Sequence, residues 1–148
     1  MIVMGVFSII VMPVVGILVD KWGRIPTIIL ALFLGGIGLI LIGVCPDPFS
    51  GLIYPGVLLA AFGMAGALVG ANTLAADASP KGLVGSILGG LNTMQPIGVL
   101  FFLGVGGYLF DAFGPGWAFG VKGVATLLLS IWMFAVRNRI TEEIEAAA

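Results

Sequence analysis

Five long apolar runs, each close to the length of a membrane-spanning helix, constrain this chain more than any other feature. A helix needs about 20 mostly apolar residues to cross roughly 30 Å of hydrocarbon. The mean hydropathy is +1.24 and only 9% of the residues are charged, against about 25% in an ordinary soluble domain. We therefore predict an all-α fold, a polytopic transmembrane helix bundle that forms one membrane domain over residues 1–148. Its five expected spans are about 1–19, 27–45, 53–76, 83–110 and 116–136, followed by a tail at 137–148.

The basic residues predict the orientation of the bundle. With five spans, successive connections alternate between the two sides of the membrane, and one side receives five of the six basic residues: Lys21, Arg24, Lys81, Arg137 and Arg139. Basic residues at span ends mark the cytoplasmic side. We therefore expect the first connection and the C-terminus to be cytoplasmic, with the segments 45–51 and 111–116 on the opposite side.

The residue types present argue against several classes of function. The chain has no histidine and one cysteine, Cys45, and its spans carry no pair of carboxylates for acid–base work. The acidic residues Asp20, Asp47, Asp77 and Asp111 all fall at expected helix ends, so no carboxylate is placed for proton coupling. We expect no enzyme activity, no cofactor, no metal and no nucleic-acid partner, since the sequence shows no basic stripe on a soluble surface.

One eight-residue pattern occurs twice. Residues 16–23 read GILVDKWG and residues 107–114 read GYLFDAFG, so that both are Gly-x-Leu-x-Asp-x-aromatic-Gly. They end the first and fourth expected spans, on opposite sides of the membrane. This is what an inverted-topology repeat predicts. The alternative is that glycine, aspartate and aromatic residues are simply common at helix ends.

The first copy also resembles a known motif. Gly16, Asp20, Lys21, Gly23 and Arg24, together with Leu18, match the cytoplasmic loop motif of the Major Facilitator Superfamily, the twelve-helix secondary transporters. The usual basic residue after Gly-Arg is replaced by Ile25, which is more typical of the second copy of the motif in that family. The stretches ADASPKGLVGSILGGLNTMQPIG and GGYLFDAFGP are similar to the helix ten–eleven connection and helix eleven.

The resemblance implies a partial fold of that family, covering helices eight to twelve of an incomplete C-terminal six-helix half. It implies that the chain is a fragment whose partner is the missing N-terminal half. It also implies transport of an unknown small solute by alternating access, within the lipid bilayer of a prokaryotic plasma (inner) membrane. The abrupt apolar start at Met1 fits a fragment. The alternative is a short, non-transporting membrane protein that acts as an oligomeric or accessory subunit.

The resemblance also assigns a role to the first connection. Gly16 and Gly23 would permit a tight turn and close helix approach, while Asp20 would latch the two halves of the transporter in one state. Lys21 or Arg24 would pair with a carboxylate. The alternative is a solvated anchor that obeys the positive-inside rule and has no gating role.

Polar residues inside the spans are candidates for a solute path. Asn92, Thr93, Gln95 and Pro96 lie in the fourth span, where Pro96 removes a helical hydrogen bond and favours a kink. Their amides would either line a cavity or bond a neighbouring helix. Lys122 lies inside the fifth span, where it would either snorkel to the outer interface or attract an anion.

Overall fold

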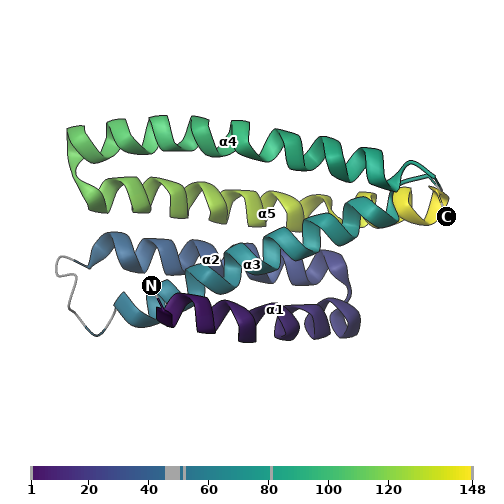
Figure 1. The fold of residues 1–148 in the computed structure, drawn as a ribbon, viewed down its shortest axis with the longest axis horizontal. Coiled ribbons are helices and arrows are strands. Elements are labelled where there is room, and N and C mark those ends of the chain that lie inside the picture. Colours follow the sequence, from purple (N-terminus) through teal and green to yellow (C-terminus); the bar gives the residue numbers. More distant parts are fainter. Residues whose placement is uncertain (1, 46–50, 52, 81, 148) are drawn as a thin grey trace.

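In the computed structural model, the described residues form five helices in the order of the five apolar runs, each antiparallel to the next (Figure 1). The structure describes residues 2–45, 51, 53–80 and 82–147, and the side chains of residues 11, 13–45, 51, 53–80 and 82–138. Within these residues every regular element is an α-helix, which confirms the predicted all-α fold. The helices are α1 (Ile2–Trp22), α2 (Arg24–Val44), α3 (Ile53–Asp77), α4 (Val84–Phe113) and α5 (Pro115–Ala147).

Four of the helices are long and apolar enough to cross a bilayer: α2, α3, α4 and the part of α5 up to Asn138. Helix α1 has 21 residues, about 31 Å at 1.5 Å per residue, but most of its side chains in the N-terminal half are outside the described set. That α1 spans the membrane therefore remains a prediction from the sequence. The loop at 46–50, Lys81 and the side chains of the tail beyond Asn138 also lie outside the described residues, so the expectations placed on them remain predictions.

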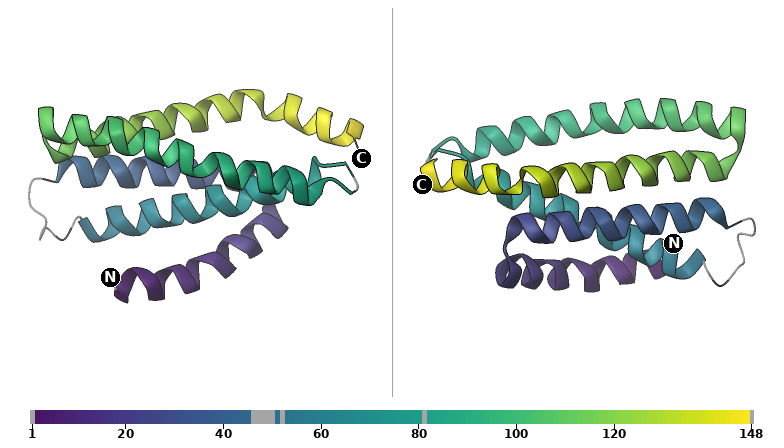
Figure 2. Two further views of the ribbon diagram at one scale, coloured as in Figure 1. Left: turned by 45° about the horizontal axis from the view of Figure 1, so that its top comes forward. Right: turned by 180° about the vertical axis from the view of Figure 1, so that it is seen from behind.

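The connections sort to the two ends of the bundle (Figures 1 and 2). The α1–α2 turn, the α3–α4 connection and the C-terminus lie at one end, which we call the Gly23 end. The α2–α3 connection and the α4–α5 turn lie at the other, which we call the Gly114 end. This is the arrangement that alternating spans require, because each helix carries the chain to the opposite end.

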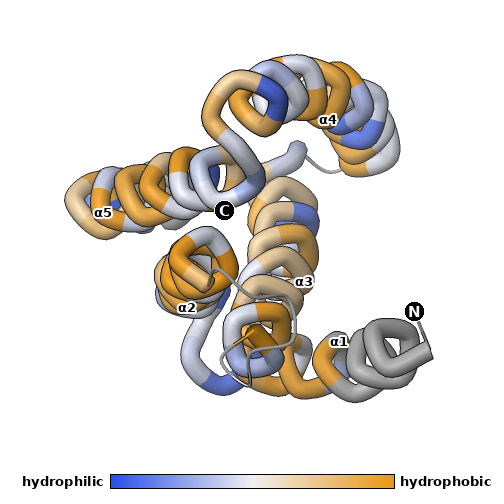
Figure 3. The backbone as a smooth tube through the Cα atoms, turned by 90° about the vertical axis from the view of Figure 1, so that its left-hand side faces the viewer, coloured by the Kyte–Doolittle hydropathy of each residue, from blue (hydrophilic) through white to orange (hydrophobic). Residues whose placement is uncertain are grey.

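Helix α2 is the centre of the bundle. Viewed end-on, it lies beside α3 and α5, while α1 and α4 occupy the periphery (Figure 3). Apart from Thr27, its buried residues occupy two adjoining faces: Ile28, Ala31, Gly35 and Gly38 lie toward α3, and Gly36 lies toward α5. Packing between apolar helices in lipid depends on close contact rather than on water exclusion. Small residues on two faces of α2 therefore allow two neighbours to approach it.

The glycines of α2 define these approaches. A Cβ on Gly35 would lie 3.0 Å from the Gly63 Cα in α3, and a Cβ on Gly38 would lie 2.6 Å from the Gly56 carbonyl oxygen. On the α5 side, a Cβ on Gly36 would lie 3.1 Å from the Gly123 carbonyl oxygen. The α2–α3 and α2–α5 interfaces are thus backbone-to-backbone contacts, which tolerate no larger side chain without movement.

The two outer helices differ in how they attach. Helix α1 packs Val11, Val15 and Val19 against residues of α3 that include Phe62 and Val69. Helix α4 contacts α5 and the end of α3, yet none of its described residues is buried. An apolar helix of 30 residues is therefore left almost without cover.

Candidate functional site

The α1–α2 turn is formed by a single glycine. Gly23 has φ 88° and ψ 163°, a region that is essentially restricted to glycine. Its N–H donates to the Val19 carbonyl at 3.1 Å, which closes the last turn of α1, and α2 begins at the next residue. Gly16 has a different environment, because a Cβ there would meet nothing within 4 Å. Only the tight-turn role is therefore visible, and it belongs to Gly23.

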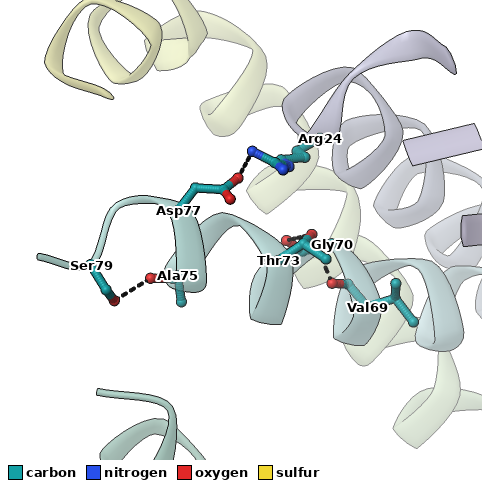
Figure 4. Close-up of polar contacts among 7 residues, drawn as sticks. All are labelled: Arg24, Val69, Gly70, Thr73, Ala75, Asp77 and Ser79. Carbon is teal, nitrogen blue, oxygen red and sulfur yellow. Dashed lines mark hydrogen bonds and ion pairs between the residues drawn. The ribbon is translucent and has the colours of Figure 1, made fainter. Parts of the chain in front are cut away.

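Arg24 connects this turn to a distant helix. Its guanidinium forms an ion pair with the carboxylate of Asp77, the last residue of α3 (Figure 4). The sequence left open which carboxylate a basic residue of the motif would meet, and in the structure it is this one. The two side chains are 47% and 29% exposed, so the pair ties α2 to α3 at the surface of the Gly23 end.

The end of α3 is stabilised by its own hydroxyl groups. Thr73 lies within hydrogen-bond distance of the Val69 and Gly70 carbonyls, at 3.0 and 2.9 Å, and Ser79 donates to the Ala75 carbonyl (Figure 4). The last carbonyls of a helix have no partner within it. The Ser79 contact supplies a donor there, next to Asp77.

Asp20 and Lys21 are not drawn into this cluster. Both side chains are exposed, and among the described residues neither takes part in an ion pair. The motif is thus divided: Gly23 shapes the turn, Arg24 pairs within the chain, and Asp20 and Lys21 project from it.

Sequence reasoning missed Thr27. Its side chain is 1% exposed, and its hydroxyl lies 2.7 Å from the Gly23 carbonyl and 3.3 Å from the Leu18 carbonyl. It therefore bonds across the turn and holds the end of α1 against the start of α2. A threonine four residues after a turn glycine is a detectable signal, because threonine often bonds the carbonyl four residues earlier.

The candidate polar residues of α4 lie on an open helix. Asn92, Thr93, Gln95 and Pro96 are all exposed, and α4 continues through Pro96 without a break. Thr93 donates to the Gly89 carbonyl of its own helix at 2.8 Å. Within the described part of the chain, the amides of Asn92 and Gln95 make no side-chain hydrogen bond. They lie within about 10 Å of the midpoint of α4 at 1.5 Å per residue.

Lys122 is also exposed, on α5. It lies five residues after Trp117, about 7.5 Å along the helix axis. No described carboxylate forms an ion pair with it.

The structure contains an apolar cavity of about 520 Å³ at the Gly114 end. Its walls come from the end of α2 and from the α4–α5 turn, and they include Ile40, Val44, Phe113, Trp117, Val121 and Val124. None of the polar residues proposed from the sequence lines it. The candidate solute-path residues therefore belong to the open surface of α4 and to α5, not to this cavity.

Comparisons with known proteins identify the family. The family model of the Major Facilitator Superfamily matches residues 1–147. The magnetosome protein MamH of Paramagnetospirillum magneticum AMB-1 is 36% identical over 136 residues, which is 92% of this chain and 32% of MamH. The magnetosome proteins MamZ of the same organism and of Magnetospirillum gryphiswaldense MSR-1 are 32% and 31% identical over 120 residues, which is 79% of this chain.

The chain spans about a third of MamH and less than a fifth of each MamZ. No solved structure gives a significant match. The family match and the four apolar helices make the chain an integral membrane protein of a family of transporters rather than enzymes. The resemblance drawn from the residues of the first turn is confirmed, and the chain belongs to the Major Facilitator Superfamily.

Proposed function

We propose that the chain is part of a secondary transporter that moves a small solute across a bacterial membrane by alternating access. Family membership supports this directly. The chain matches only 32% of MamH, which further supports a role as one portion of a larger bundle. The remaining portion would supply the other half of the solute path. The proposal includes that helices α1 to α5 belong to the C-terminal half of the transporter.

The observation that carries the proposal is the exposed helix α4. It is apolar enough to span a bilayer, yet none of its described residues is buried, and it presents the two unbonded amides of Asn92 and Gln95. Polar groups within a membrane span are costly and tend to face a bundle interior or a water-filled cavity. The face of α4 that carries Asn92 and Gln95 therefore suits a solute path better than it suits lipid. Lys122, on the adjoining helix, would contribute positive charge near the other end of that path.

The first turn would act at the Gly23 end of the path. There, the Arg24–Asp77 pair holds α2 and α3 together, and the free carboxylate of Asp20 remains to engage the other half of the transporter. Gly16, Lys21 and Gly23 complete the motif, with Gly23 setting its shape. By the positive-inside rule we place this end, and the C-terminus, in the cytoplasm.

The names of the relatives suggest where to look for the protein. MamH and MamZ are named magnetosome proteins, so we propose the magnetosome membrane as well as the plasma membrane as its location. Fractionation of cells that carry a C-terminally tagged copy at the native locus would distinguish the two. An immunoblot of the tagged protein from the same fractions would also give the size of the product. A transporter on the scale of MamH has about 425 residues, since 136 residues make up 32% of it.

A second function is compatible with the exposed α4 helix: a short accessory subunit that uses α4 to bind another membrane protein. Cysteine accessibility separates the two functions without knowledge of the solute. In the full-length protein with Cys45 replaced by serine, Gln95→Cys would report the proposed path. Leu128→Cys, whose native side chain is 62% exposed on α5, would report lipid.

For a transporter, a membrane-impermeant maleimide should label Gln95→Cys from both sides of the membrane and leave Leu128→Cys unlabelled. Labelling from two sides requires that the path opens alternately to each. A Gln95→Cys variant that resists labelling from both sides would remove the path from α4 and favour the accessory subunit.

A further inference from the structure

The chain contains two turns of the same construction, one at each end of the bundle. The α1–α2 elbow comprises residues 16–24 and the α4–α5 elbow comprises residues 107–115. In each, one helix ends at a glycine and the next helix begins directly after it. Gly23 has φ 88° and ψ 163°, and Gly114 has φ 91° and ψ 170°.

The hydrogen bonds of the two elbows also match. The N–H of Gly23 donates to the Val19 carbonyl at 3.1 Å, and the N–H of Gly114 donates to the Phe110 carbonyl at 3.0 Å. The shared sequence pattern therefore produces a shared backbone. Chance use of common helix-end residues would not by itself require the same dihedral angles and the same bond.

The two elbows lie at opposite ends of the bundle. Figures 1 and 2 place the α1–α2 elbow at one end of the bundle and the α4–α5 elbow at the other, because α1 and α4 run in opposite directions. The aromatic residues that precede the glycines, Trp22 and Phe113, are 64% and 62% exposed. Exposed aromatic rings at both ends suit the two membrane–water interfaces.

Each elbow carries an aspartate three residues before its glycine. Asp20 and Asp111 are both exposed, and within the described residues neither forms an ion pair or a side-chain hydrogen bond. A carboxylate in the last turn of a helix faces the negative end of the helix dipole, which is unfavourable. Because neither carboxylate is engaged within the described residues, both are available to a group outside them.

The surroundings of the two aspartates differ in one respect. The α1–α2 elbow contains two basic residues, Lys21 and Arg24, of which Arg24 pairs with Asp77, whereas the α4–α5 elbow contains none. Asp111 therefore has no basic residue in its own elbow. Its partner must supply the positive charge, as a basic side chain or as the N-terminus of a helix.

We propose that the α4–α5 elbow is a second latch, in which Asp111 binds a cationic group of the remaining portion of the transporter at the Gly114 end. The proposal rests on the function proposed above. In a rocking transporter one end closes as the other opens, so carboxylates at opposite ends stabilise opposite states. Asp20 then favours closure at the cytoplasmic end and Asp111 favours closure at the outer end.

The test uses the full-length protein with Gln95→Cys as the accessibility reporter and Cys45 replaced by serine. Asp111→Asn should raise the maleimide labelling rate from outside and lower it from the cytoplasm. Asp20→Asn should do the reverse. We expect each shift to be about 1.4- to fivefold, the range for loss of one exposed charge contact.

Two further variants separate the charge from the shape of the elbow. Asp111→Glu keeps the charge and should retain most of the wild-type labelling ratio, which is the labelling rate from outside divided by the labelling rate from the cytoplasm. Gly114→Ala keeps Asp111 but strains the turn at φ 91°, and should shift the ratio in the same direction as Asp111→Asn. Size-exclusion profiles in detergent would identify any variant that fails to fold.

The outcomes distinguish failure of the second latch from failure of the proposed transporter function. If Asp20→Asn shifts the ratio and Asp111→Asn does not, or if both shift it in one direction, the second latch is wrong and the transporter stands. If the reporter is never labelled from both sides, even without these substitutions, the proposed function fails before the latch is reached.

Discussion

Substitution of Gly63 by alanine tests the glycine packing on which the bundle depends. A Cβ on Gly63 would lie 2.6 Å from the Ala31 carbonyl oxygen and 2.7 Å from the Gly35 nitrogen, and it would also press on the Gly35 Cα. Ordinary van der Waals contact begins at about 3.4 Å. Helices α2 and α3 would therefore have to separate by at least about 0.8 Å at this point, because the neighbouring atoms are backbone and no rotamer change can move them.

The expected magnitude follows from two opposing terms. Overpacking of a close interface costs about 1–3 kcal/mol, while alanine in place of glycine gains about 0.5–1 kcal/mol in a helix interior. We expect Gly63→Ala to lower the free energy of unfolding by about 1–2 kcal/mol. Gly35→Ala should cost less, because its Cβ would meet the Gly63 Cα at 3.0 Å.

The assay is equilibrium unfolding of the full-length protein in mixed micelles with increasing SDS, followed by tryptophan fluorescence. Gly120→Ala is the matched control, since a Cβ there would meet nothing within 4 Å. It should leave the free energy of unfolding unchanged or raise it by up to about 1 kcal/mol. If Gly63→Ala is as stable as Gly120→Ala, backbone contact between α2 and α3 does not hold the bundle together.

Three further predictions concern neighbouring contacts. Gly123→Ala should destabilise α5 against α2 relative to Gly120→Ala in the same SDS titration, because its Cβ would lie 3.0 Å from the Ile40 nitrogen; equal stability of the two variants would contradict this packing. Ser130→Ala should lower the free energy of unfolding by about 0.6 kcal/mol, since the Ser130 hydroxyl donates to the Ile29 carbonyl of α2 at 3.0 Å; a variant with wild-type stability would show that this bond contributes nothing. A double-mutant cycle with Arg24→Gln and Asp77→Asn should give a coupling of about 0.2–1 kcal/mol, the range for a partly exposed pair, and the coupling should fall in high salt; strict additivity would show that the pair makes no contribution.

The candidate site was only partly readable from the sequence. The turn at Gly23 follows from local residue types, because its φ of 88° favours glycine. The partner of Arg24 did not follow, because Asp77 is far away along the chain and only the packing of α2 on α3 brings the two together. Thr27 was overlooked for a related reason: in an apolar run it reads as a neutral residue, and its role appears only when the two helices meet at the turn.

The sequence by itself determined the number, order and type of the elements. In a bilayer every backbone polar group must be bonded within the protein, and an apolar run of about 20 residues meets this requirement as a single spanning helix. It also determined the family, through the residues of the first turn.

Only the tertiary structure decided which helix faces meet. Gly66 and Gly70 have the same four-residue spacing as Gly85 and Gly89. A Cβ on Gly66 would collide with Ala31, and one on Gly70 with Ile28, whereas Gly85 and Gly89 meet nothing within 4 Å. Spacing is a property of one helix, but contact requires a second helix at the right distance and rotation. That second helix is α2 for α3, whereas no helix among the described residues lies against Gly85 and Gly89 of α4.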